Sequence, residues 1–245
     1  MKYSELANIL VIHQPNFFPT IKVLNKLLSG NKLIFLDDVQ YVRNDIQNRI
    51  KFRNLKNPES LFWFSAGVKK GSSRKKINDV AFFSFEEMAY KLEKTIFDTY
   101  SSSIHYPFLE KYLQVVLSKN QSILSDFNIF SLTKLLEILN IDLKYDLSSN
   151  LSLDHSITGE SRLIEITKSV GYSTYLSGLG GKNYINPENF NNENITLLWH
   201  PWISPHNDEK SLTWDKVSFI DFIARYGERE LKCYITKKRI VSKID

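Results

Sequence analysis

The chain has 245 residues, of which 42% are hydrophobic, 24% charged and 13% aromatic, a composition typical of a globular protein with a substantial core. A formal charge of +5 is too small to indicate nucleic-acid binding, and a lone cysteine, Cys233, excludes an internal disulfide and a cysteine-based zinc site. No apolar run approaches the roughly 18 residues of a membrane span. We therefore expect a cytoplasmic protein that does not insert into membranes.

The first predicted elements form a strand–helix–strand unit. The apolar run NILVI at 8–12 predicts a buried strand, which Pro15 and Pro19 end. Residues 20–30 have apolar side chains at helical spacing, with Thr20 as the expected N-cap and Gly30 as the stop. The segment KLIFLDDVQYV then predicts a second strand. Such a short unit implies that the two strands are parallel.

The remaining elements continue this alternation. Strands are expected at 61–68, 141–151 and 194–202 and at the start of 173–185, which then becomes a glycine-rich loop. Helices are expected at 84–140 in several pieces, at 159–171 and at 218–227, the last ending at Gly227. Ser84 and Glu87 have the spacing of a capping box. The pattern predicts an α/β fold with a mostly parallel, Rossmann-like central sheet. It also predicts one domain, 1–245, in which 83–140 forms a helical subdomain packed alongside or inserted.

The segment HQPNFFP at 13–19 is the first candidate site. It places His13, Gln14 and Asn16 directly after a buried strand, on a loop stiffened by two prolines. Ligands of parallel sheets usually bind at this end of the strands, and a rigid loop suits a preorganised site. His13 is a candidate general base, because its ordinary pKa of about 6.5 lies near neutrality. The competing interpretation is a turn whose polar side chains bond their own backbone.

The second candidate is the acidic pair Asp37 and Asp38 at the end of the next strand, which could accept a proton, orient a sugar hydroxyl or bind a cation. Polar residues follow it. Amides suit polyhydroxylated ligands and arginine suits phosphate or carboxylate. The candidates of this run are Gln40, Asn44, Asn48 and Arg49. The alternative is a solvated surface segment.

The third candidate is the glycine-rich segment SGLGGKNY at 177–184. Glycines let a backbone approach a ligand closely, and backbone amides with a lysine can hold phosphate. The segment has the spacing of neither the P-loop nor the dinucleotide fingerprint, so a tight turn is the alternative. His200 ends another predicted strand and could line the same cleft. The candidates are Ser177, Gly178, Gly181, Lys182, Tyr184 and His200.

Four segments, taken in order, resemble the WbqC-like protein family: IHQPNFFP, KLIFLDDVQYVRNDIQNR, YLSGLGGKNYI and VSFIDFIARYG. The resemblance spans almost the whole chain, and its first two motifs are specific. It implies an association with bacterial O-antigen and other surface-polysaccharide genes, including those of lipopolysaccharide. Thr20 and Ile46 depart from the family pattern, in which aromatic residues are usual, and this leaves the ligand open. The matching residues are His13, Gln14, Pro15, Asn16, Asp37, Asp38, Gln40, Asn48, Arg49, Ser177, Gly178, Tyr184, Ser218 and Asp221.

The expected activity is acyl or aminoacyl transfer to the amine of a nucleotide-linked sugar. Such transfer needs a base, here His13 or Asp38, donors for the acyl oxygen, and a phosphate site. The donor would be a CoA or carrier thioester, an aminoacyl-tRNA or a free acid with ATP. No tightly bound metal is expected, and a homodimer is left open.

Two alternatives remain. The first is a metal-dependent hydrolase or nucleotidyl-transfer relative that uses Asp37 and Asp38. The layout of the first elements also resembles that of nucleotidylyltransferases, but the H-x-G-H motif is missing. The second alternative is a non-catalytic protein that binds nucleotide-sugars or glycans.

Overall fold

The structure, a computed structural model, describes residues 8–54, 57, 60–154, 156–205 and 214–237. The strands are β1 (Ile9–His13), β2 (Lys32–Phe35), β3 (Arg49–Arg53), β4 (Leu61–Ser65), β5 (Tyr145–Leu147), β6 (Thr174–Gly178) and β7 (Thr196–His200). The α-helices are α1 (Ile21–Leu27), α2 (Phe85–Tyr100), α3 (Tyr106–Ser118), α4 (Leu124–Ile138), α5 (Gly159–Ser169), α6 (Pro187–Asn192) and α7 (Phe219–Thr236). Within these described ranges, no helix combines the length and the apolar character needed to cross a membrane.

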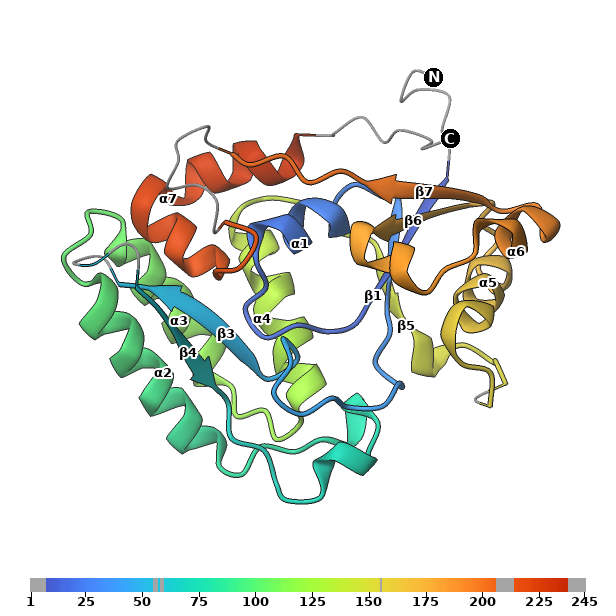
Figure 1. Cartoon of the computed structure of the whole chain (residues 1–245). Helices are drawn as coiled ribbons and strands as arrows, with labels where there is room; N and C mark the ends of the chain where they lie inside the picture. The colour runs from blue at the N-terminus through green and yellow to red at the C-terminus, as the bar shows by residue number, and fades with distance from the viewer. Residues whose placement is uncertain (1–7, 55–56, 58–59, 155, 206–213, 238–245) are drawn as a thin grey trace.

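The central sheet has the strand order β5-β2-β1-β6-β7, and every neighbouring pair is parallel (Figure 1). This confirms the predicted α/β fold with a Rossmann-like layout. The chain moves outward from β1 through β2 to β5 and then crosses back to β6 and β7. The direction of winding therefore changes between β1 and β6, and in such sheets ligands bind at the carboxyl ends of the strands beside this point.

Both faces of the sheet are covered, because the side chains of each strand alternate between them. In β1, Ile9 and Val11 join the larger apolar core, whereas Leu10 and Ile12 join the smaller one. Helices α1, α4 and α7 cover the first face and α5 and α6 the second (Figure 1). A strand buried on both faces reads as a continuous apolar run, which is why ILVI was recognisable in the sequence.

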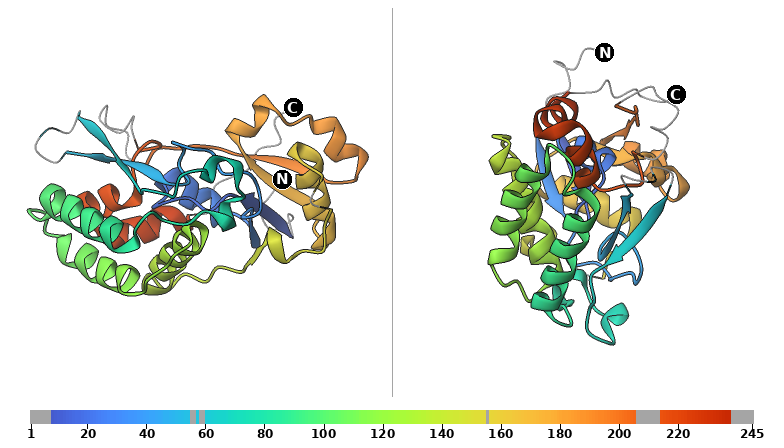
Figure 2. Two further views of the ribbon diagram at one scale, coloured as in Figure 1. Left: turned by 90° about the horizontal axis from the view of Figure 1, so that it is seen from below. Right: turned by 90° about the vertical axis from the view of Figure 1, so that its left-hand side faces the viewer.

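The antiparallel hairpin of β3 and β4 lies apart from the central sheet, beside α2 and the start of α7 (Figure 2). Its inner face carries Phe52 and Phe64, and the Phe52 ring contacts Tyr100 of α2, with 6.2 Å between ring centroids. The sequence did not predict β3. Its apolar residues, Ile50 and Phe52, alternate with basic ones, so only one face of this strand is apolar.

The predicted N-caps of α1 and α2 are confirmed: Thr20 accepts a hydrogen bond from Val23 N, and Ser84 accepts one from Glu87 N. The predicted stop of α1 at Gly30 was wrong, because the helix ends at Leu27 with Leu28 as its C-cap.

The predicted stop at Gly227 is confirmed, because the helical conformation breaks there, with φ of 84° and ψ of 168°. A second helical stretch, which was not predicted, follows the break and continues α7 to Thr236. A side chain at this position would also meet the His105 ring, since a Cβ would lie 2.8 Å from its Cε1. The glycine therefore ends the first helical stretch and makes the kink between the two.

Candidate functional site

A cavity of about 550 Å³ lies at the carboxyl ends of β1, β6 and β7, beside the change in winding direction. Helix α1 and the short 3₁₀ helix η5 (Leu179–Asn183) complete its walls. The volume falls within the range of roughly 300–1,000 Å³ that small-molecule sites occupy. Among the predicted site residues, the lining includes His13, Gln14, Asn16, Ser177, Gly178, Gly181, Tyr184 and His200.

The loop after β1 is held rigidly by its apolar residues. Phe17 and Phe18 are fully buried, and the Phe18 ring packs edge-on against Phe127. Phe18 has a φ of 42°, an unusual conformation for a bulky side chain, which the surrounding packing maintains. Asn128 of α4 donates hydrogen bonds to Pro15 O (3.1 Å) and to Gln47 O (2.8 Å). The polar residues of this loop are therefore presented by a fixed backbone.

The start of α7 also holds this loop in place through hydrogen bonds. Ser218 Oγ donates to Phe18 O at 3.0 Å and accepts a hydrogen bond from Ile220 N. Phe219 N donates to Pro19 O at 3.0 Å. Ser218, a motif residue 200 positions after Phe18 in the chain, thus supports the first motif without lining the cavity.

Three side chains, Lys26, His13 and Asn16, form a chain of hydrogen bonds along the cavity wall, which we call the cavity cluster. The Lys26 ammonium lies 3.2 Å from His13 Nδ1 and 3.4 Å from Ile12 O. His13 Nε2 lies 2.9 Å from Asn16 Oδ1. Because an ammonium only donates, Nδ1 is the acceptor and Nε2 carries the proton. This arrangement fixes the orientation of the Asn16 amide and leaves Asn16 Nδ2 buried without a hydrogen-bond partner among the described residues.

The electrostatics of the cavity cluster are unusual. Burial lowers the pKa of Lys26 from 10.5 to about 8. Burial, followed by the positive charge of Lys26, lowers the pKa of His13 from 6.5 to about 3, and the hydrogen bond to Asn16 opposes this only in part. At pH 7 His13 is therefore neutral and Lys26 is largely charged. Within the described residues, no carboxylate forms an ion pair with Lys26.

The ends of β6 and β7 form the opposite wall. His200 is buried, and its Nε2 lies 3.1 Å from Oδ1 of Asn25, whose amide nitrogen donates to the carbonyls at the end of α7. Gly181 is required sterically, because a Cβ there would lie 2.4 Å from Ser177 Oγ. The glycine-rich segment therefore packs tightly against its own strand and presents Gly178 beside Lys26.

Gln14 extends the wall toward a segment that the sequence left as a polar run. It accepts a hydrogen bond of 2.8 Å from Gln47 Nε2, and Gln47 Oε1 accepts one from Val42 N. Gln47 has no exposed surface. Its side chain therefore fixes the Gln14 amide.

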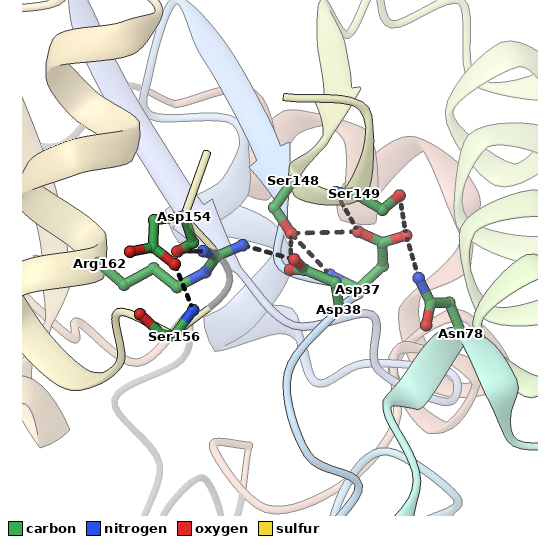
Figure 3. Close-up of polar contacts among 8 residues, drawn as sticks. All are labelled: Asp37, Asp38, Asn78, Ser148, Ser149, Asp154, Ser156 and Arg162. Carbon is green, nitrogen blue, oxygen red and sulfur yellow. Dashed lines mark hydrogen bonds and ion pairs between the residues drawn. The ribbon is translucent and has the colours of Figure 1, made fainter. Parts of the chain in front are cut away.

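The acidic pair lies outside the cavity lining and is engaged by the protein (Figure 3). Asp37 accepts hydrogen bonds from Ser149 N (3.0 Å), Ser149 Oγ (2.7 Å) and Asn78 Nδ2 (3.3 Å). Asp38 accepts a hydrogen bond from Ser148 and forms a buried ion pair with Arg162 of α5. The pair thus joins the ends of β2 and β5 to α5.

The other sequence candidates also lie outside the lining. Gln40 Nε2 donates to Ser73 O, Asn44 is exposed in a turn with φ of 60°, and Asn48 Nδ2 donates to Ala66 O. The Arg49 guanidinium stacks on Trp63, 4.1 Å from the ring centroid, and Lys182 lies 5.7 Å from the Trp199 centroid.

Lys22, Lys26 and Tyr175 line the cavity and were not recognised from the sequence. The two lysines are four residues apart and so share one face of α1. That face has the appearance of an ordinary solvated helix surface. The available signal was its position: the helix follows a candidate loop at the carboxyl end of a parallel strand, where a polar helix face can border a ligand site.

Comparisons with known proteins agree with the sequence resemblance. The sequence model of the WbqC-like protein family matches residues 14–233. The chain is also similar to the uncharacterized protein Rv1507c of Mycobacterium tuberculosis, with 23% identity over 224 residues that cover 89% of this chain and 94% of the relative. No solved structure matches the chain.

Proposed function

We propose, since the chain belongs to the WbqC-like protein family, that it is an enzyme of bacterial surface-polysaccharide biosynthesis. The proposed reaction transfers an acyl or aminoacyl group to the amine of a nucleotide-linked sugar. The observation that supports it is the cavity beside the change in winding direction. His13, Asn16 and the glycine-rich segment all line this cavity, and its volume suits a small-molecule ligand.

In the proposed reaction, the sugar amine attacks the acyl carbonyl of a thioester or ester donor. The carbon–nitrogen bond forms as the bond to the leaving group breaks. His13 accepts the proton that the amine loses and returns it to the leaving group. Asn16 Nδ2, a buried donor without a partner among the described residues, is available to bind and orient the nucleotide-linked sugar.

The pKa of His13 sets a condition on this role. A pKa of about 3 keeps the ring unprotonated at pH 7 but makes it a weak base. A negative charge bound beside Lys26 would offset the lysine and raise the pKa of His13. We therefore expect His13 to become an effective base only when substrate is bound.

The test is a transfer assay with UDP-, GDP- and dTDP-linked amino sugars and a set of acyl-CoA donors, with products identified by mass spectrometry. A product heavier by the acyl group is expected from the wild type, and none from His13→Ala. Circular dichroism and thermal unfolding would establish that this variant is folded. Turnover near the wild-type rate in folded His13→Ala would remove His13 from the mechanism.

Binding without catalysis is the second candidate function. It is favoured by the occupation of both His13 ring nitrogens, one by Lys26 and one by Asn16. A protein that binds nucleotide-sugars tightly but gives no product with any donor class would support this alternative over transfer.

The geometry gives less support to a metal-dependent activity of the acidic pair. Asp37 and Asp38 already have serine, asparagine and arginine partners. In the described ranges, no group of three or more His, Cys, Asp or Glu residues is placed to hold a metal ion. A rise in melting temperature with Mg²⁺ or Mn²⁺ would revive this alternative.

A further inference from the structure

Among the described residues, two buried donor groups of the cavity cluster are incompletely matched: the Lys26 ammonium has no anionic partner, and the Asn16 amide nitrogen has no acceptor. Lys26 is only 8% exposed, yet its contacts among the described residues are a neutral ring nitrogen and one carbonyl oxygen. Asn16 is 7% exposed, and its Nδ2 has no partner in the part of the chain that the structure describes. Buried charges are normally paired and buried amides hydrogen-bonded, because leaving them otherwise is costly.

The other ionisable groups around the cavity do not neutralise the charge of Lys26. The cavity lining also contains Lys22, Asp45, Tyr175, Tyr184 and His200. Asp45 supplies the single carboxylate among the residues recorded in this lining, and its Oδ1 accepts a hydrogen bond from Ile46 N. The Lys26 side chain borders Gly178, where a Cβ would lie 3.7 Å from Lys26 Cδ. The ammonium therefore lies beside a glycine whose backbone a ligand can approach closely.

We propose that the cavity binds a ligand through an anionic oxygen group that pairs with the Lys26 ammonium, while Asn16 Nδ2 donates to a second acceptor of the same ligand. The diphosphate of a nucleotide-linked sugar supplies such a group. This inference rests on the proposed function for the choice of a diphosphate. It assigns the phosphate site to Lys26 rather than to Arg49 or Lys182, to which the sequence pointed.

The placement of Arg49 and Lys182 supports this choice. Both lie outside the cavity lining and have aromatic partners, Trp63 and Trp199 respectively. Lys26 has a pKa of about 8 without a ligand, and an adjacent anion would raise this value. The anion would thus complete the charge balance that the fold itself leaves open.

Calorimetric titrations of the purified protein test the anionic group. UDP, GDP and dTDP are compared with uridine, guanosine and thymidine, and galacturonate with galactose. At least one nucleoside diphosphate should bind ten times more tightly than its nucleoside, and more weakly as the pH rises past 8. Preference for galacturonate over galactose, without preference for any diphosphate, would assign the site to a carboxylate and overturn the diphosphate. Equal binding within every pair would overturn the anionic site altogether.

Two substitutions test the residues. Lys26→Met removes the ammonium and retains the bulk, and Asn16→Asp retains the acceptor for His13 Nε2–H while removing the donor. Each should weaken diphosphate binding at least tenfold. The matched control Lys94→Met removes an exposed lysine of α2, paired with Asp98, and should change binding less than twofold. Wild-type affinity in folded Lys26→Met, or an equal loss in Lys182→Met, would overturn the assignment.

A spectroscopic readout separates anion binding from a merely structural role of Lys26. The ring nitrogens of His13, followed by NMR, should show a higher pKa in the diphosphate complex than in the free protein. An unchanged His13 pKa in a saturated complex would contradict the site.

The two proposals can fail separately. Lys26-dependent diphosphate binding without any transfer product would retain the anion site and reject the transfer reaction. Product formation that Lys26→Met leaves unchanged would retain the transfer reaction and reject the anion site.

Discussion

Two clusters of buried polar side chains lie at the carboxyl end of the sheet, and they differ in how completely their charges are matched. In the acidic cluster, formed by Asp37, Asp38, Ser148 and Arg162, both carboxylates have protein donors and one has a buried arginine. In the cavity cluster, Lys26 has no carboxylate partner within the described residues, and Asn16 has an unused donor.

This difference distinguishes a cluster that supports the fold from a cluster that forms a ligand site. A buried network whose members satisfy one another holds segments together and has no need of a ligand. A buried cluster with a surplus of positive charge and donors destabilises the fold unless a ligand completes it, which is the usual compromise at functional sites. Both clusters contain motif residues of the family, so motif membership alone does not distinguish the two roles.

The largest expected effect comes from breaking the acidic cluster. Arg162→Met would leave the Asp38 carboxylate buried without its cation, and should lower the free energy of unfolding by about 3–5 kcal/mol. Urea denaturation measures this change. The control Lys168→Met removes an exposed partner of Glu193 and should cost less than about 1 kcal/mol. A loss in the free energy of unfolding for Arg162→Met as small as that of the control would show that the acidic cluster does not hold these segments together.

The next effect is an acid sensitivity that originates in the cavity cluster. The folded protein has a His13 pKa of about 3, whereas the unfolded chain has the ordinary value near 6.5. Below pH 6.5 the unfolded state therefore binds a proton that the folded state does not, and stability falls as the pH decreases. Between pH 6.5 and 3.5 this contributes a loss of about 4 kcal/mol. His13→Gln should lack this contribution, so parallel stability–pH curves for the two proteins would contradict the lowered pKa.

Removing the unbalanced charge should stabilise the protein. The pKa of Lys26 is about 8 in the folded state and 10.5 in the unfolded chain, so its cost is fully present below pH 8 and disappears above 10.5. Lys26→Met should therefore raise the free energy of unfolding at pH 7 by about 3 kcal/mol, and this gain should shrink as the pH rises through that window. Denaturation curves at pH 7 and pH 10.5 test it. A destabilised variant at pH 7 would mean that Lys26 already has a partner.

The smallest effect concerns the hydrogen bonds of Ser218, which hold the loop after β1 against the start of α7. Ser218→Ala removes the cap of α7 and the hydrogen bond to Phe18 O, and should cost about 1–2 kcal/mol. Urea denaturation gives the cost, and NMR should show His13 with an unchanged tautomer. A shifted tautomer would mean that the hydrogen bonds of Ser218 and the cavity cluster are coupled more closely than their separate contacts indicate.

Much of the fold could be predicted from the sequence because its signals are local. The apolar run of β1, the caps at Thr20 and Ser84, and the alternation of strands and helices each depend on neighbouring residues. Strand β3 was not predicted, although its alternation of basic and apolar residues is typical of a half-buried strand, because it directly follows a polar run. The helical stretch after Gly227 was not predicted, because a glycine stop does not show whether a second helix follows.

The candidate site was predictable only in part. The sequence by itself determined that polar residues follow the buried strands, and that His13, Asn16 and the glycine-rich segment stand at strand ends. Only the tertiary structure decided that Asp38 meets Arg162, 124 positions away, while Lys26 meets His13 at the cavity wall. The physical reason is that the burial and the charge partners of a polar side chain depend on which distant segments pack against it, and no local pattern encodes that.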